Sequence, residues 1–226
     1  MTEAEWLACK SCDRALLFLR KRVSNRKLRL FACACCRLVG DLLTGEAAWR
    51  ALAVAEDYAD GRALRGDLRA GRREAAPATI NFSNMAGHVA HIAVVRATHE
   101  MAWQAARQAA SVAAEADSYR EPRRPGGIAD AASVYQRELA LLREIFNPFR
   151  APAEDARPAP SVRGLAAAAY EEQALPSGHL DTNRLGVLAD ALEEAGCADA
   201  DLLGHLRAPR PHVRGCWALD LVLGKE

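Results

Sequence analysis

The feature that most constrains the fold is a run of apolar residues at helical spacing near the C-terminus. Leu185, Leu188, Ala189 and Leu192 stand at positions i, i+3, i+4 and i+7, which places all four on one face of a helix. Asp181 or Thr182 just before them can cap that helix, because their side-chain oxygens accept a hydrogen bond from an unpaired backbone N–H. Gly196 suits a left-handed residue that ends it.

Two further short helices are predicted after Gly196. Asp199 or Asp201 begins the first, and Pro209 and Pro211 end it, because proline lacks a backbone N–H and clashes with the preceding turn. The very apolar residues 213–223 form the second. Short helices joined by Pro and Gly turns predict a compact helical module with no strand.

The rest of the chain shows helical periodicity as well, and no convincing alternation of apolar and polar residues. A Thr2-x-x-Glu5 capping box begins the first helix. The helical pattern continues over residues 11–23, and other helices are expected over residues 26–43, 46–58, 62–74, 85–117, 130–146 and 161–173. We therefore predict an all-α protein, a helical bundle of about nine or ten helices with a small C-terminal helical module.

A proline-rich segment divides this pattern. Residues 147–160 contain four prolines and are expected to be extended, because the residue before a proline avoids the helical region. The predicted organisation is an N-terminal helical bundle over 1–146, a strap or linker over 147–160, and the C-terminal module over 161–226, which packs separately or as one domain with the bundle.

Composition bounds the class of protein. The sequence contains no run of about 18 apolar residues, so it predicts no membrane span. The acidic, polar start Thr2-Glu3-Ala4-Glu5 does not resemble a signal peptide. A cytoplasmic protein is the default expectation. Its seven cysteines, an odd number, should then be thiols or metal ligands and not a disulfide framework.

The net charge is unevenly spread. Residues 1–75 hold 15 Lys and Arg and 10 Asp and Glu, whereas residues 151–226 hold 7 and 12. The two ends therefore carry about +5 and −5, so they attract each other or bind different partners.

The N-terminal and C-terminal segments both resemble sequences of one protein family. The N-terminal MTEAEWLAC…RKLRLFACACCR and the C-terminal LADALEEAGC…PHVRGCWALDLVLGKE resemble the ends of a paralogous helical protein family expanded in planctomycete-type bacteria, a family of uncharacterised function. The resemblance covers roughly residues 1–60 and 182–226. Repeated duplication of the family implies diversification of protein partners; it supplies no chemistry.

The N-terminal cysteines form the first candidate metal set. Cys9 and Cys12, with Cys33, Cys35 and Cys36, supply enough thiolates for zinc. Cys35 and Cys36 lie in apolar rows of their helix, however, and Cys33 lies on the opposite side, so a role in the core is expected. Cys33 lies near three arginines, which predicts a lowered pKa and mild reactivity.

The second candidate set is Cys197, His205, His212 and Cys216, two thiolates and two imidazoles around short turns. Such donors form closed zinc sites, but the spacing matches no known zinc finger and Cys216 lies in an apolar helix.

A third set consists of His88, His91 and His99. These histidines share one side of a helix, but His88 and His99 are about 16 Å apart along its axis, so one metal ion cannot bind all three.

A cluster of basic residues near the N-terminus is the candidate interaction surface: Arg20, Lys21, Arg22, Arg26, Lys27, Arg29 and Arg37. Clustered cations suit phosphate binding, yet no helix-turn-helix spacing is evident. Docking to acidic residues, such as Glu193, Glu194, Asp199 and Asp201 of this chain or those of a partner, explains the cluster equally well.

Catalytic motifs are absent from the sequence. It has no phosphate-binding loop, dinucleotide fingerprint, Gly-x-Ser-x-Gly or His-Glu-x-x-His. The expected function is a non-catalytic protein–protein interaction or scaffold module of a bacterial cytoplasmic system, with no cofactor and a protein as the partner. The alternatives are a zinc-stabilised helical module that uses Cys197, His205, His212 and Cys216, and a nucleic-acid-associated accessory protein that uses the basic face.

Overall fold

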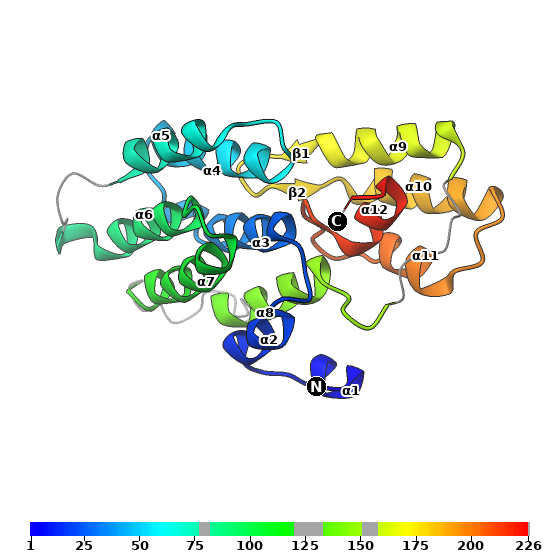
Figure 1. Ribbon diagram of the computed structural model, residues 1–226, viewed down its shortest axis with the longest axis horizontal. Helices are drawn as coiled ribbons and strands as arrows, with labels where there is room; N and C mark the ends of the chain where they lie inside the picture. The colour runs from blue at the N-terminus through cyan, green and yellow to red at the C-terminus, as the bar shows by residue number, and fades with distance from the viewer. Residues whose placement is uncertain (77–81, 120–132, 151–157, 226) are drawn as a thin grey trace, which may run out of the picture. The chain divides into compact units, whose positions relative to one another are not determined.

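The fold was obtained as a computed structural model that describes residues 1–76, 82–119, 133–150 and 158–225. These residues form twelve α-helices, two short 3-10 helices and one small β-hairpin (Figure 1). The predicted all-α class is therefore confirmed. The number of helices is higher than the nine or ten expected, partly because a helix predicted as continuous is divided in two.

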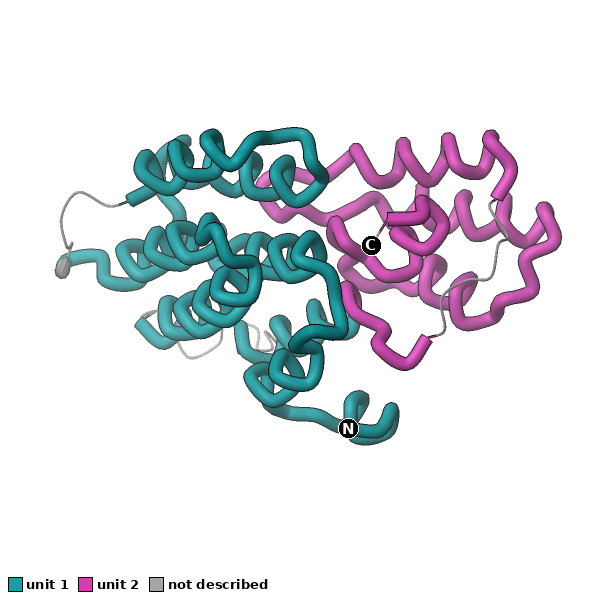
Figure 2. The backbone as a smooth tube through the Cα atoms, viewed as in Figure 1, with its two compact units in different colours: residues 1–143 teal, residues 144–226 magenta. Residues whose placement is uncertain are grey.

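The chain forms two compact units, residues 1–143 and residues 144–226 (Figure 2). The division falls within the last turns of helix α8 (Val134–Ile145), shortly before the proline-rich segment. Residues 151–157 of the predicted strap, and residues 130–132 of the predicted helix over 130–146, lie outside the described residues.

Helix α3 (Asn25–Leu38) is the centre of the first unit. It packs against α4 (Glu46–Ala59), α6 (Met85–Ala97) and α7 (Ala102–Ser118). Every residue from Leu28 to Cys36 is buried, so α3 has no solvent-exposed side over that length. The other elements of this unit are α1 (Glu3–Leu7), α2 (Cys12–Leu19), α5 (Arg65–Ala75), α8 up to Arg143, and the 3-10 helices η1 (Gly40–Leu42) and η2 (Phe82–Asn84).

The single long helix predicted over residues 85–117 is wrong, because α6 ends at Ala97 and α7 begins at Ala102. Arg29 explains the break. Its guanidinium donates hydrogen bonds to the carbonyl oxygens of Ala97, His99 and Glu100 at 3.1, 2.7 and 2.9 Å. Carbonyl groups at a helix end need such partners, and a cation there complements the helix dipole.

The second unit is built from four helices: α9 (Pro160–Glu171), α10 (Thr182–Glu194), α11 (Ala200–Leu206) and α12 (Trp217–Leu223). Their apolar faces form one core that includes Tyr170, Leu185, Leu188 and Leu206. Two predicted caps are confirmed: Asp181 accepts a hydrogen bond from the Asn183 backbone N–H at 2.8 Å, and Asp199 accepts one from Leu202 at 3.0 Å.

The second unit also contains a strand pair, which corrects the prediction of a strand-free module. Strands β1 (Gln173–Ala174) and β2 (His179–Leu180) form an antiparallel hairpin, and His179 forms an isolated bridge with Val213. Strands of two residues are too short to show an alternating sequence pattern. Within the described ranges, no helix is long and apolar enough to cross a membrane.

Candidate metal centre

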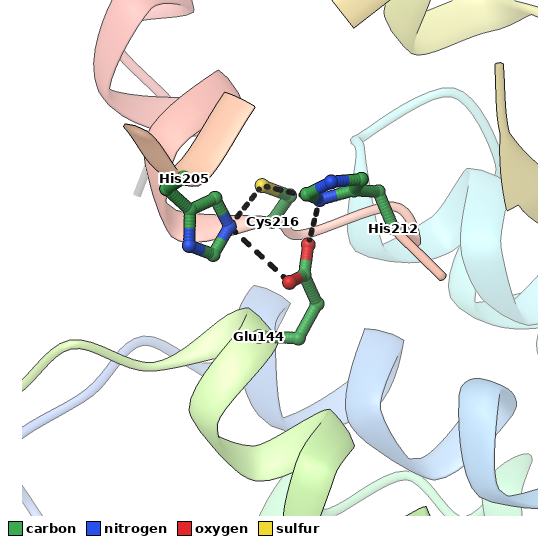
Figure 3. Close-up of side chains that lie close together, drawn as sticks. All are labelled: Glu144, His205, His212 and Cys216. Carbon is green, nitrogen blue, oxygen red and sulfur yellow. Dashed lines mark hydrogen bonds and ion pairs between the residues drawn. The ribbon is translucent and has the colours of Figure 1, made fainter. Parts of the chain in front are cut away.

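Four buried side chains converge in the second unit: Glu144, His205, His212 and Cys216 (Figure 3). Each offers one ligand atom, and the four atoms all lie within 4.8 Å of one another. The side chains come from four separate places in the chain and point toward a common centre. The relative exposure of these residues is between 0 and 6%, so the cluster is closed to solvent.

Helix ends position three of the four. Glu144 is the penultimate residue of α8, and His205 lies in the last turn of α11. Cys216 is the N-cap residue of α12, directly after Gly215, whose φ of 88° suits glycine. Pro209 and Pro211 end α11 as predicted, and the chain between them and Gly215 carries the fourth residue.

The backbone holds His212 in place. The backbone N–H of Leu180 in β2 donates to the His212 carbonyl oxygen at 2.8 Å, next to the bridge from His179 to Val213. The Nε2 atom of His212 lies 3.1 Å from the Ala208 carbonyl oxygen. A carbonyl can only accept, so Nε2 carries the ring proton and donates it.

The distances within the cluster are short. His205 Nε2 lies 3.2 Å from both Cys216 Sγ and Glu144 Oε2. His212 Nδ1 lies 2.8 Å from Glu144 Oε1 and 4.0 Å from Cys216 Sγ. Around one tetrahedral zinc ion with bonds of about 2.0 to 2.3 Å, ligand atoms lie about 3.3 to 3.6 Å apart. The observed distances between ligand atoms are shorter than this range for three pairs, at 2.8 to 3.2 Å, and longer for one, at 4.0 Å.

The electrostatics of the cluster favour a negative carboxylate. Burial alone would raise the pKa of Glu144, but its contacts with His205 and His212 outweigh burial and lower this pKa to about 2. Burial lowers the pKa of His205, and Glu144 only partly opposes that effect. Burial, with the neighbouring Glu144 charge, raises the pKa of the Cys216 thiol.

One oxygen of the buried carboxylate lacks a well-formed hydrogen bond. Glu144 Oε2 lies 3.2 Å from His205 Nε2 and 3.9 Å from Arg210 Nε, but neither contact has hydrogen-bond geometry. A buried carboxylate oxygen whose hydrogen bonding is incomplete is costly. A divalent cation at the centre of the cluster would complete the contacts of this oxygen, and it would lower the pKa of the buried thiol.

The structure brings together three of the four residues that the sequence predicted as ligands, His205, His212 and Cys216. Cys197 is not in the cluster; it is partly exposed and lines a groove described below. Glu144 takes its place, 53 residues before Cys197 in the sequence. One signal could have identified it: an acid in the last turn of a helix opposes the helix dipole unless it is paired.

The N-terminal cysteines form no such site. Cys9, Cys12, Cys33, Cys35 and Cys36 are buried, and within the described ranges the cluster at Glu144 is the only group of three or more convergent metal-ligand side chains. The predicted reactivity of Cys33 is wrong. Its exposure is 0%, and burial raises the pKa of its thiol, an effect that the nearby Arg29 and Arg37 do not overcome.

The seven basic residues do not form one surface. Arg29 is buried against carbonyl groups, Arg37 pairs with Glu56 at 2.8 Å, and Arg26 pairs with Asp60 at 2.8 Å. The prediction of one basic surface is wrong, because Arg29 lies in the fully buried part of α3 and the charges of Arg26 and Arg37 are paired with acids at α4. The remaining exposed cations are Arg20, Lys21 and Arg22, with Lys27 half-buried.

The prediction that His88, His91 and His99 share one helix is wrong, because α6 ends at Ala97. His99 lies beyond the end of α6 and its Nδ1 accepts a hydrogen bond from the Met101 backbone N–H at 3.1 Å. His91 contacts the carbonyl oxygens of Gly87 and Thr44 at 2.8 and 2.9 Å. Both nitrogen atoms of the His91 ring, the atoms that can bind a metal, therefore already contact carbonyl oxygens.

Comparisons with known protein families, curated proteins and solved structures found no match to this chain.

Proposed function

We propose that residues 144–226 form a zinc-stabilised helical module without catalytic activity. The observation that carries the proposal is the convergence of four ligand atoms from Glu144, His205, His212 and Cys216 within 4.8 Å, all from buried side chains. When bound, the ion supplies a cross-link between four parts of the chain and neutralises the buried negative charge.

The donor set favours zinc over other common ions. One sulfur, two imidazole nitrogens and one carboxylate oxygen are borderline to soft donors, whereas Mg²⁺ and Ca²⁺ require oxygen ligands. The hydrogen bond from His212 Nε2 to the Ala208 carbonyl oxygen is the support that metal-ligating histidines normally have, because it directs the other ring nitrogen, Nδ1, toward the centre that it shares with Glu144.

The number and burial of the ligands favour a structural role. Catalytic zinc sites have three protein ligands and an open fourth position, whereas structural sites are closed by four. Here four side chains surround the centre, and none is more than 6% exposed. No ligand position remains for a substrate.

The elements that the ion would join need such support. Helices α11 and α12 have seven residues each, and helices this short are marginal without tertiary contacts. His205 lies on the first and Cys216 caps the second. A bond from each to one ion fixes both helix ends, and a bond to Glu144 fixes the end of α8.

The test is metal content with matched cysteine variants. The full chain, purified without chelator and also refolded with ZnCl₂, is measured by elemental mass spectrometry. We expect one zinc per chain in the wild type and in Cys197→Ser, and substoichiometric zinc in Cys216→Ser, which loses one of the four proposed ligands. Equal zinc content in the two serine variants, or substoichiometric zinc in refolded wild type, contradicts the proposal.

A second candidate is the interaction role expected from the sequence, and a groove in the same unit favours it. A groove of about 490 Å³ is lined by apolar side chains of α10, α11 and α12, among them Leu192, Leu202 and Leu221. The ion pair between Arg150 and Asp199 lies in its wall. We propose that it receives a short apolar segment of a partner protein, since pockets of this size and lining suit such groups.

Cys197 provides the test of the groove. It is the one cysteine that is not buried, and all seven lie in the described part of the chain. A photo-crosslinker attached to Cys197 should capture a defined polypeptide that excess synthetic peptide of the crosslinked sequence displaces. Labelling of Cys197→Ser provides the background. Capture that the peptide does not displace, or no capture, contradicts an interaction at this groove.

A further inference from the structure

Arg210 contacts the edge of the metal centre. Its Nη2 atom lies 2.7 Å from Nδ1 of His205, and its Nε atom lies 3.9 Å from Glu144 Oε2. A guanidinium only donates hydrogen bonds. Nδ1 of His205 is therefore the acceptor, and in a neutral ring the proton is on Nε2, the atom that faces Glu144 and Cys216.

This arrangement is the opposite of the one at His212. There the distal ring nitrogen donates to a carbonyl oxygen, so in a neutral ring the nitrogen that faces the centre, 2.8 Å from Glu144 Oε1, carries no proton. A metal bound at Nε2 of His205 requires the proton on Nδ1. With the proton on Nδ1, that N–H would face a second donor, Arg210, and the positive ion would lie near a fixed positive charge.

Arg210 is able to leave the site. Its side chain is 47% exposed, so its charge can move into water at small cost. Its backbone is restricted, because Pro209 and Pro211 flank it and proline limits both its own φ and the residue before it. The sequence thus keeps the arginine beside His205 while its side chain remains free to move.

We propose that Arg210 is a built-in competitor of the metal ion: it stabilises the metal-free centre through His205 and is displaced when zinc binds. The inference rests on the proposed zinc site and adds its regulation. Arg210 lowers the affinity for zinc, so occupancy follows the free zinc concentration instead of being permanent.

The experiment compares zinc affinities of the full chain by competition with a chromophoric chelator. Arg210→Gln removes the charge and offers an acceptor to Nδ1–H, whereas Arg210→Lys keeps a cationic donor. Arg207→Gln is the control, because Arg207 pairs with Asp190 and Glu193 outside the centre. We expect about tenfold tighter binding for Arg210→Gln, by the usual size of outer-ligand effects, and affinities near wild type for the other two.

Thermal unfolding gives a second readout that a merely structural arginine would not produce. Arg210→Gln should unfold at a lower temperature than wild type in chelator, because the contact with His205 is lost, and at an equal or higher temperature in excess zinc. This reversal separates competition from general destabilisation.

The outcomes separate the two proposals. If wild type binds one zinc but Arg210→Gln binds it equally or more weakly, Arg210 is not a competitor and the zinc module stands. Tighter binding by Arg210→Lys, equal to that of Arg210→Gln, also overturns the inference. If wild type binds no zinc, the proposed function fails and the inference falls with it.

Discussion

His212 and Ala208 are joined by a hydrogen bond of 3.1 Å, from the ring Nε2 of the histidine to the carbonyl oxygen of the alanine. The bond encloses three residues, Pro209, Arg210 and Pro211. It fixes both the orientation and the tautomer of the imidazole before any ion arrives. The local backbone therefore holds the His212 ring in position, so this candidate ligand is not a mobile side chain.

Zinc should stabilise the folded chain in proportion to the logarithm of its free concentration. A ligand that binds only the folded state adds about 1.4 kcal/mol to the free energy of unfolding for each tenfold rise above its dissociation constant. Thermal unfolding in buffers of defined free zinc measures the effect. In Cys216→Ser the unfolding temperature should change much less over the same range; a wild-type temperature that does not depend on zinc contradicts the site.

Thiol labelling should distinguish Cys197 from the other six cysteines. In the native, zinc-loaded chain we expect one thiol to react with an alkylating reagent, because Cys197 is partly exposed and the others are buried. Peptide mapping by mass spectrometry identifies the labelled residue. Rapid labelling of Cys33 would contradict its burial and support the reactivity that the sequence predicted.

The helices and their caps could be predicted from local pattern because capping and periodicity act over a few residues. Asp181 and Asp199 are examples of this local control. The role of Arg29 could not be predicted: its partners lie about 70 residues away, at Ala97, His99 and Glu100, and only the tertiary fold brings them together.

The same limit applies to the metal centre. His205, His212 and Cys216 lie within 12 residues of one another, so a helix followed by a turn brings them close. Their residue types alone therefore suggested them as ligands. Glu144 joins them only through the packing of the second unit. Cys197 was included in the predicted ligand set because it is close in sequence to the other three residues and its thiol can bind zinc. Neither property determines where its side chain points.

Arg29 should contribute strongly to the stability of the first unit. Arg29→Met keeps the length of the side chain but leaves the three carbonyl oxygens without their donor. A buried acceptor left without its donor costs about 1 to 3 kcal/mol, so we expect a loss of a few kcal/mol for the three carbonyl groups together. Urea unfolding followed by circular dichroism gives the loss. Arg73→Met, an exposed arginine of α5, is the control; equal stability of the two variants would mean that Arg29 is dispensable.

Glu138 should make the stability of the chain fall as the pH rises. It is 1% exposed and its Oε1 atom has no hydrogen-bond partner among the described residues. Burial, together with Asp117 and Asp13, raises its pKa from 4.5 to about 8 although Arg137 opposes the shift. The folded chain thus keeps a proton that the unfolded chain releases, so the free energy of unfolding decreases between about pH 4.5 and pH 8 and then levels off.

Glu138→Gln isolates this contribution, because the amide has nearly the same shape and stays neutral. At pH 5 the two chains should have similar stability. At pH 9 the variant should be more stable by a few kcal/mol, since one pKa unit corresponds to about 1.4 kcal/mol. Comparing the two chains at each pH removes the pH dependence they share, including that of zinc binding, and Glu115→Gln on the exposed face of α7 should show no such difference. A constant difference from pH 5 to pH 9 would show that Glu138 does not hold a proton in the folded chain at neutral pH.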